Sequence, residues 1–209
     1  MLTGNAGAWL PQFRSLGDRF FTILGAVWPD CLAPLIPIDG PLTLENRITN
    51  QLVLTIIRSK RLPARIIPQY ALLTERPNGT AHLSSEVDFV IAIGDDESVY
   101  LACECKRLNV PFPSGKKSLV AEYLDDGLGR FSHGQYAAKL PYALMLGFVM
   151  DGNVPSAQAA LHNSLPSRKS KLNMMNLPVA NDDNPFSTHH DRTDQDPIEV
   201  VHRLLAWPS

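Results

Sequence analysis

The sequence contains little cysteine and no excess of positive charge. Cysteine occurs three times in 209 residues, and Cys103 and Cys105 lie too close along one segment to form an unstrained disulfide. Lys and Arg number 19 against 21 Asp and Glu, which gives a formal net charge of -2. We therefore expect a cytoplasmic protein in a reducing compartment. Any site for a polyanion must be local, because the overall charge does not attract nucleic acid.

Long hydrophobic runs and several catalytic motifs are also missing. The apolar stretch FFTILGAVW at 20–28 is far shorter than the roughly 20 residues that span a bilayer, and no secretory signal pattern surrounds it. We therefore expect a packed helix there and no membrane association. The sequence has no G-x-S-x-G elbow, no G-x-x-x-x-G-K loop and no H-E-x-x-H helix, which disfavours an unrelated hydrolase.

The sequence that remains predicts an α/β fold with a mixed central sheet. Thr43 is expected to cap a helix whose first turn contains Glu45. The turns PNGT and GDDE separate three β-like runs into a meander, and YALMLGFVM at 142–150 has the composition of a fully buried strand. The proline-rich segment 29–41 and the polar tail 172–197 are expected to be loops. The predicted helices are 8–28, 43–60, 118–131 and 155–166, the predicted strands are 69–75, 86–93, 98–107 and 142–150, and 197–207 is a last strand or short helix.

Charged residues interrupt two of the predicted strands. Glu104 and Lys106 share one face of the run VYLACECKRL, and Asp88 stands among apolar residues of the preceding run. Neighbouring antiparallel strands bring Asp88 beside Glu104, where the two carboxylates repel and raise a pKa unless a cation intervenes. Oxygen ligands with open positions suit Mg²⁺ or Mn²⁺. Lys106 beside such an ion could orient or deprotonate a water, or offset charge on a phosphate. The alternative is a solvated surface pair, which contributes only about 0 to 1 kcal/mol.

These residues resemble the PD-(D/E)XK nuclease superfamily, which has the restriction-endonuclease-like fold. Asp88 followed by Glu104-Cys105-Lys106 is similar to its motif, and the predicted element order from residue 43 to about 150 is similar to its αβββαβ core. The resemblance implies that Asp88, Glu104 and the backbone carbonyl of Cys105 hold the metal and that Lys106 activates water. Glu45 is similar in position to a glutamate that many members carry on the first helix.

The resemblance also implies a domain plan and differs from the family pattern at one position. Residues 41–171 would form the nuclease-like core, 1–40 a helical segment packed on it, and 172–209 a polar loop and terminal element that complete the same domain. Val87 stands where the motif has proline. The segments LDDGLGRFSHGQYA, MLGFVMDG and THHDR are similar to a bacterial branch of the superfamily. The Gln-x-x-x-Tyr pattern of the exonuclease branch is absent, because Gln135 and Tyr136 are adjacent.

Further polar residues are candidates for contacts with nucleic acid. Arg130, His133, Gln135 and Lys139 follow the third helix in a glycine-broken segment, where they could bind phosphate or form an ordinary solvated turn. The basic stretch at 58–65 either binds phosphates or offsets a helix dipole.

The histidine-rich segment 189–192 and the C-x-C pair have simpler explanations than a metal site. Adjacent histidines cannot easily share one tetrahedral zinc ion, so we expect a polar loop there, with phosphate contacts from His190 and Arg192 as the second choice. Cys103 and Cys105 are expected to be small buried residues of a strand.

The sequence thus predicts a Mg²⁺- or Mn²⁺-dependent nuclease that acts on DNA in preference to RNA. Cleavage of both strands would need a two-fold dimer or two successive nicks, and targeting would come from a protein partner or from regulation. A role in bacterial antiviral defence is implied by resemblance alone. The alternative is a catalytically silent subunit of the same fold that binds nucleic acid or a protein partner.

Overall fold

A mixed seven-stranded sheet forms the centre of the molecule. The computed structural model describes residues 10–75, 80–92, 99–178, 184–193 and 195–208. The strand order is β1-β2-β3-β6-β9-β8-β7, in which β3, β6 and β9 are parallel and the other neighbours are antiparallel. This architecture confirms the predicted α/β class with a mixed sheet. The strands are β1 (Arg65–Glu75), β2 (Ala81–Ala92), β3 (Tyr100–Leu108), β6 (Tyr142–Val149), β7 (Met174–Asn176), β8 (Phe186–Arg192) and β9 (Gln195–Ala206).

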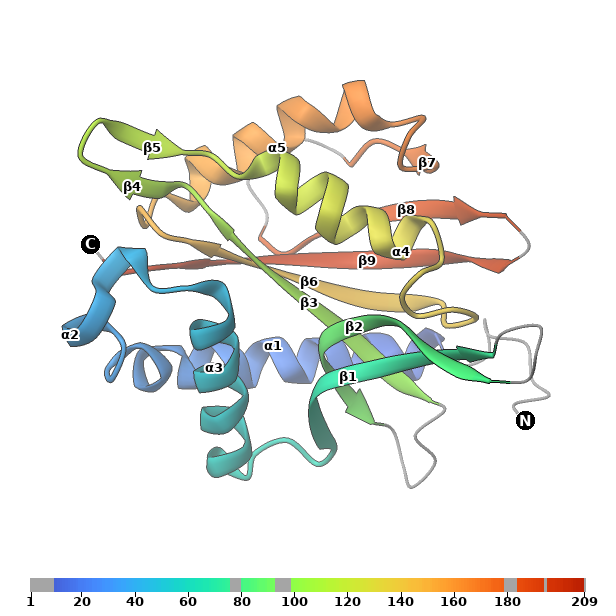
Figure 1. The fold of residues 1–209 in the computed structure, drawn as a ribbon, viewed down its shortest axis with the longest axis horizontal. Helices are drawn as coiled ribbons and strands as arrows, with labels where there is room; N and C mark the ends of the chain where they lie inside the picture. Colours follow the sequence, from blue (N-terminus) through green and yellow to red (C-terminus); the bar gives the residue numbers. More distant parts are fainter. Residues whose placement is uncertain (1–9, 76–79, 93–98, 179–183, 194, 209) are drawn as a thin grey trace.

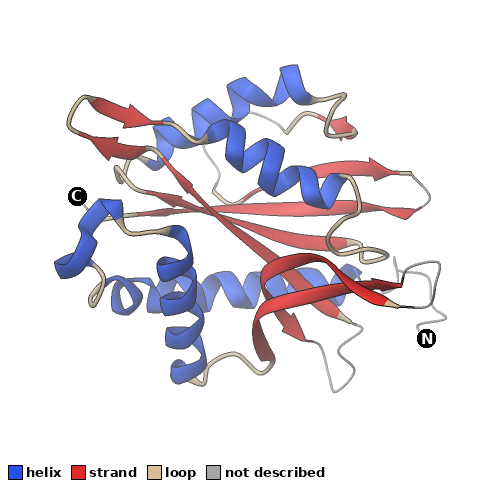
Figure 2. Cartoon of the chain, viewed as in Figure 1, coloured by secondary structure: helices blue, strands red, loops and turns tan. Residues whose placement is uncertain are grey.

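Helices cover both faces of this sheet (Figures 1 and 2). α1 (Leu10–Leu32) and α3 (Glu45–Ser59) lie on one face, where Trp28 stacks on Phe148 at 5.6 Å between ring centroids. The π-helical segment η3 (Glu122–Leu128), α4 (Gly129–Ser132) and α5 (Val154–Arg168) lie on the other face, where the Tyr123 hydroxyl bonds His202 at 3.0 Å. Alternate side chains of the central strands therefore enter two separate apolar layers.

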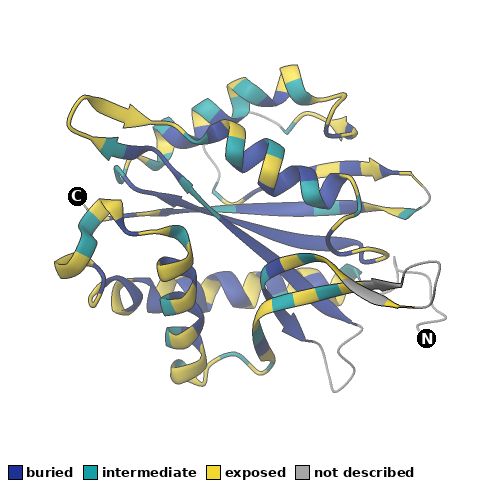
Figure 3. Ribbon diagram, viewed as in Figure 1, coloured by how far each residue is buried: buried dark blue, intermediate teal, exposed yellow. Residues whose placement is uncertain are grey.

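The central strands are buried because both of their faces are covered (Figure 3). All eight residues of β6, YALMLGFV, are buried, as the continuous apolar run predicted. β6 lies between two parallel neighbours, so its backbone donors and acceptors are paired within the sheet. The three-stranded meander β1-β2-β3 is likewise confirmed. The predicted turns at 77–80 and 94–97 and the expected helix start at 8–9 fall largely or wholly outside the described residues.

The proline-rich segment is helical, which corrects the predicted loop. α1 continues to Leu32 with Pro29 in its last turns, and α2 (Ile36–Asp39) and the 3-10 turn η2 (Gly40–Leu42) follow. Pro37 and Pro41 lie in the first turns of α2 and η2, where proline is tolerated because the missing N–H has no helical partner. Thr43 does not cap α3: Leu44 takes the N-cap position, and the Thr43 hydroxyl donates to the Gly40 carbonyl at 2.6 Å.

The C-terminal tail contains strands where a polar loop was predicted. In β8 the side chains of Phe186, Thr188, His190 and Arg192 alternate inward, so polar residues occupy buried positions and the apolar period of two is hidden. β9 pairs with both β6 and β8, which makes 195–206 a strand of the same sheet. The hairpin of β4 (Val110–Phe112) and β5 (Gly115–Lys117) extends from the end of β3.

In the described part of the chain, no single helix is long and apolar enough to span a membrane. α1 reaches the length and composition of a span only together with the segment Ile36–Leu42, from which it is bent by 49°.

Candidate functional site

The site lies where β2 separates from β3. Among the described residues, these strands pair from Phe89–Cys103 to Ala92–Tyr100, whereas β2 continues its pairing with β1 and β3 its pairing with β6. Continuing the β2–β3 register by one residue places Asp88 opposite Glu104 on one face. Beyond Cys103, the edge of β3 that faces β2 therefore needs other partners for its backbone groups.

Carboxylates supply two of these partners. The Cys105 N–H donates to Asp88 Oδ2 at 2.7 Å, and the Arg107 N–H donates to Glu45 Oε2 at 2.8 Å. The next alternate donor, the Asn109 N–H, bonds the Ser118 carbonyl at 3.0 Å. Asp88 comes from β2 and Glu45 from the first turn of α3, so two elements distant in sequence are fixed to one strand edge. The backbone itself thus positions both acidic groups.

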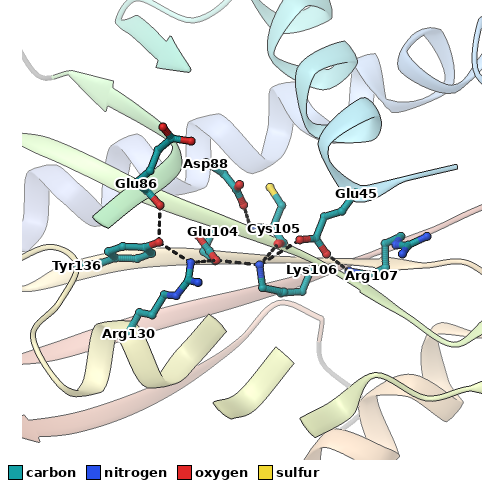
Figure 4. A network of polar contacts seen from close by, with 9 residues as sticks. All are labelled: Glu45, Glu86, Asp88, Glu104, Cys105, Lys106, Arg107, Arg130 and Tyr136. Atoms are coloured by element: carbon teal, nitrogen blue, oxygen red, sulfur yellow. Dashed lines mark hydrogen bonds and ion pairs between the residues drawn. The ribbon is translucent and has the colours of Figure 1, made fainter. Parts of the chain in front are cut away.

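The Lys106 ammonium is surrounded by oxygen acceptors (Figure 4). Its Nζ lies 2.9 Å from Glu104 Oε1, 3.1 Å from Glu45 Oε1 and 3.0 Å from the Cys105 carbonyl oxygen. Burial lowers the pKa of Lys106, but the carboxylates of Glu104 and Glu45 raise it and prevail, so the net shift is upward. Lys106 is therefore held as a cation between two carboxylates.

Glu104 is the most deeply buried acid of the site, with 1% of its side chain exposed. Burial, and then the charge of Asp88, raise the pKa of Glu104 to about 7 against the opposing effect of Lys106. Burial likewise raises the pKa of Asp88, which the Cys105 N–H partly offsets. Glu104 Oε2 is buried and has no hydrogen-bond partner among the described residues. The raised pKa of Glu104 reflects the predicted repulsion from Asp88. A bound cation would relieve this repulsion and give the unpartnered Glu104 Oε2 a ligand.

Arg130 reaches the same carboxylate from the other side. Its Nη1 donates to Glu104 Oε1 at 3.1 Å and to the Tyr136 hydroxyl at 2.5 Å, and its guanidinium lies 5.3 Å from the centre of the Tyr136 ring. The Tyr136 hydroxyl in turn donates to the Glu86 carbonyl on β2, close to the point where β2 leaves β3. A continuous polar network therefore crosses the opening from β2 to α3 (Figure 4).

The donor set of this network fits a hard divalent cation. Asp88, Glu104 and the Cys105 carbonyl offer oxygen atoms, which Mg²⁺ and Mn²⁺ prefer, and no sulfur or imidazole enters the network. Glu45 is less free, because both of its oxygens are bonded to Lys106 and to the Arg107 N–H. The described residues contain no cluster of three or more His, Cys, Asp and Glu side chains that could hold a metal ion.

The remaining residues predicted for nucleic-acid contact lie at varied places. His133 is exposed and bonds the Lys171 carbonyl through Nε2 at 2.9 Å, which turns its ring toward the end of α5. Gln135 and Lys139 are exposed in the turn between α4 and β6. Of the four candidates Arg130, His133, Gln135 and Lys139, only Arg130 has its side chain in the described network.

His190 and Arg192 are not available to bind phosphate, which corrects that prediction. Both are buried on β8. The Arg192 guanidinium donates to the carbonyls of Asp196, Ala137 and Leu140 at 2.8 to 3.0 Å, and the His190 ring bonds the Leu172 carbonyl at 2.7 Å and Thr188 at 2.8 Å. The polar groups of both side chains are therefore hydrogen-bonded within the protein, where they stabilise β8 and the turn before β6.

Cys103 and Cys105 are small buried residues of a strand, as the sequence predicted. Cys31, Cys103 and Cys105 are unpaired and fully buried. Burial raises the pKa of the thiols of Cys103 and Cys105. A thiol kept protonated in this way is a poor metal ligand.

Sequence reasoning missed Tyr136 as a member of the site. Its hydroxyl joins Arg130 to the β2 backbone, although the side chain is buried like an ordinary core aromatic. The local sequence contains no signal for this role, because the role depends on where the β2–β3 ladder stops.

A cavity of about 800 Å³ lies apart from the network, between the end of α5 and β7 and β8. Its lining offers one carboxylate, Asp191, with Lys169, amides and methionines. This lining has no paired acids, so the network at the β3 edge is the better candidate for chemistry.

Comparisons with protein-family models, with curated proteins and with solved structures found no match for this chain.

Proposed function

We propose that this chain is a metal-dependent nuclease with a restriction-endonuclease-like core that hydrolyses phosphodiester bonds, in DNA in preference to RNA. One observation carries the proposal: Asp88, Glu104, the Cys105 carbonyl and Lys106 converge at the point where β2 leaves β3. The order α3, β1, β2, β3, η3 with α4, and β6 supports the αβββαβ core.

Asp88, Glu104 and the Cys105 carbonyl would hold Mg²⁺ or Mn²⁺. When bound, such an ion supplies a Lewis acid that polarises a phosphoryl oxygen and stabilises its negative charge. The unpartnered Glu104 Oε2 and the raised pKa values of both acids support a cation there.

Lys106 contributes a positive charge next to the reacting phosphate. The raised pKa of Lys106 keeps its ammonium protonated at neutral pH. In that form it can orient an attacking water by donating a hydrogen bond and offset negative charge that develops on the phosphate. Glu45 keeps the ammonium in place through its 3.1 Å ion pair. The resulting cleavage is a hydrolysis, in which water attacks phosphorus and the 3′ oxygen leaves with a proton from solvent.

The proposal is tested with purified protein on supercoiled plasmid, linear duplex, single-stranded DNA and RNA, with Mg²⁺, Mn²⁺ or chelator. We expect metal-dependent cleavage of DNA at a higher rate than of RNA. Lys106→Ala should reduce the rate by about 10²- to 10³-fold, the range for removal of one preorganised charge donor. Lys116→Ala is the matched control, because Lys116 forms an exposed ion pair with Asp151 outside the network.

Identical behaviour of the wild type, Lys106→Ala and Lys116→Ala on every substrate would refute a catalytic role for the network. Metal-dependent cleavage of RNA alone would refute the preference for DNA and keep the chemistry.

A further inference from the structure

We infer that the Arg130 guanidinium binds the phosphodiester of the substrate, and that Tyr136 positions Arg130 for this contact. The inference deepens the proposed function and depends on it for its catalytic part. It assigns a ligand class, a nucleic-acid phosphate, to one guanidinium and a supporting role to a buried tyrosine.

Hydrogen bonds occupy one of the three nitrogens of the Arg130 guanidinium. Nη1 makes both hydrogen bonds of this side chain, to Glu104 and to the Tyr136 hydroxyl. Nε and Nη2 have no hydrogen-bond partner within the described part of the chain, and 37% of the side chain is exposed. A guanidinium that is anchored at one nitrogen and open at the other two presents a fork suited to two oxygens of one phosphate.

The site contains more carboxylates than cationic side chains that bond to them. Asp88, Glu104 and Glu45 bring three carboxylates, and Lys106 already donates to Glu45 and Glu104. The Lys106 ammonium directs its hydrogen bonds at Glu45, Glu104 and the Cys105 carbonyl, whereas the Arg130 guanidinium bonds one acid of the site, Glu104. The positive charges of Lys106, Arg130 and a divalent ion exceed the negative charges of the three carboxylates by one. This net charge matches the single negative charge of a phosphodiester.

Tyr136 holds the Arg130 guanidinium in a fixed position. Tyr136 is buried, receives Nη1 at its hydroxyl and lies under the guanidinium with its ring. Its hydroxyl donates to the Glu86 carbonyl, which fixes the tyrosine to β2. An arginine held in this way loses little side-chain freedom when it binds phosphate, so its charge is preorganised.

The experiment measures binding and cleavage separately. Binding of a fluorescent DNA duplex, and of the matching RNA duplex, is measured with Ca²⁺ at several salt concentrations, and cleavage is measured with Mg²⁺. Arg130→Ala should weaken DNA binding by roughly three- to tenfold, make the slope of log affinity against log salt shallower by about one, and lower kcat by about 10²-fold. Arg14→Ala is the matched control, since Arg14 pairs with Glu199 away from the network.

Two further variants separate charge from position. Arg130→Lys keeps one positive charge, so we expect the wild-type salt slope with a kcat between the wild type and Arg130→Ala. Tyr136→Phe keeps the ring and removes the hydroxyl, so we expect a reduced kcat with an unchanged salt slope. Thermal unfolding confirms that each variant is folded.

A purely structural role for Arg130 predicts a different result. If Arg130 only holds Glu104, then Arg130→Ala lowers Mn²⁺ affinity and leaves the salt slope of DNA binding unchanged, which would overturn the inference. Absence of nucleic-acid binding by the wild type would overturn it as well. If the wild type binds DNA through Arg130 and cleaves nothing, the proposed nuclease function fails while the phosphate site stands.

Discussion

At the scale of single residues, the acids of the site serve two opposed purposes. Asp88 and Glu45 satisfy backbone N–H groups of β3, which stabilises the fold. Burial raises the pKa of both Asp88 and Glu104, and the charge of Asp88 raises that of Glu104 further, which means that the charged forms of both acids are disfavoured. The proposed metal site therefore includes a repulsion between carboxylates that a role in folding alone would avoid.

Asp88→Asn should separate these two purposes. The amide oxygen can still accept the Cys105 N–H, while the negative charge beside Glu104 is removed. We expect the free energy of unfolding to stay equal or to rise by about 1 kcal/mol, and cleavage to be lost. Denaturant unfolding of wild type and variant without metal measures the first effect. A loss of stability greater than about 2 kcal/mol would mean that the charge itself, and not the hydrogen bond, holds Asp88 in place.

A second residue-scale prediction concerns the buried histidines. His190 bonds the Leu172 carbonyl, which can only accept, so its Nδ1 carries the proton and its Nε2 accepts from the Thr188 hydroxyl. The chain continues with His202 donating to Thr188 and accepting from Tyr123. These hydrogen bonds fit neutral rings, and burial lowers the pKa of His190 from 6.5 to about 4 and that of His202 well below 6.5.

His190 should contribute an acid-sensitive part of the stability. Between pH 6.5 and about 4 the unfolded chain binds a proton that folded His190 does not, so the contribution of His190 to the free energy of unfolding falls by up to about 1.4 kcal/mol per pH unit as the pH falls, whereas Glu104, whose pKa is raised to about 7, contributes in the opposite direction. His190→Gln should remove the His190 contribution and so change the slope in that window by up to this amount, and His189→Gln, at an exposed neighbour, is the control. Urea unfolding at several pH values measures the slope. Equal slopes for His190→Gln and the wild type would contradict the assignment.

At the scale of elements, the separation of β2 from β3 creates the site. Alternation along strands, which is a local pattern, predicts that Asp88, Glu104 and Lys106 come together, whereas Glu45 was expected at the site because its position resembles that of a glutamate in the PD-(D/E)XK superfamily. The open edge itself was not predictable, since it depends on where a ladder between two strands stops.

The strand β8 was missed for a related reason. Thr188, His190 and Arg192 face inward in place of apolar residues, so the period of two carries no hydrophobic signal. The role of Tyr136 was equally hidden, because it follows from the position of the Glu86 carbonyl on another element.

The π-helical segment gives the element-scale prediction. Gly127 lies against β3 and β6, and a Cβ there would lie 2.7 Å from Met145 Cε and 3.3 Å from Lys106 Cγ. Gly127→Ala should therefore displace the end of the Met145 side chain and shift the Lys106 stem slightly, cost about 1 kcal/mol of stability and lower the cleavage rate. Gly25→Ala is the control, because no atom lies within 4 Å of its added Cβ in α1, and it should be neutral or slightly stabilising. Wild-type kinetics in folded Gly127→Ala would show that the contact does not position Lys106.

At the scale of the whole molecule, each chain carries one such network in its described residues. One centre cuts one strand at a time, so supercoiled plasmid should convert first to nicked circle and later to linear DNA at concentrations where sedimentation shows a monomer. Linear product without a nicked intermediate under those conditions would mean that two chains act together.

The central claim is that Asp88 and Glu104 form a divalent-metal site, and calorimetric titration with Mn²⁺ tests it most directly. Since both oxygens of Glu45 are engaged by Lys106 and the Arg107 N–H, we predict one ion per chain in the wild type and in Arg14→Ala. Binding should be lost in Asp88→Asn and in Glu104→Gln, provided that both variants remain folded. Equal Mn²⁺ affinity in all four proteins would contradict the account.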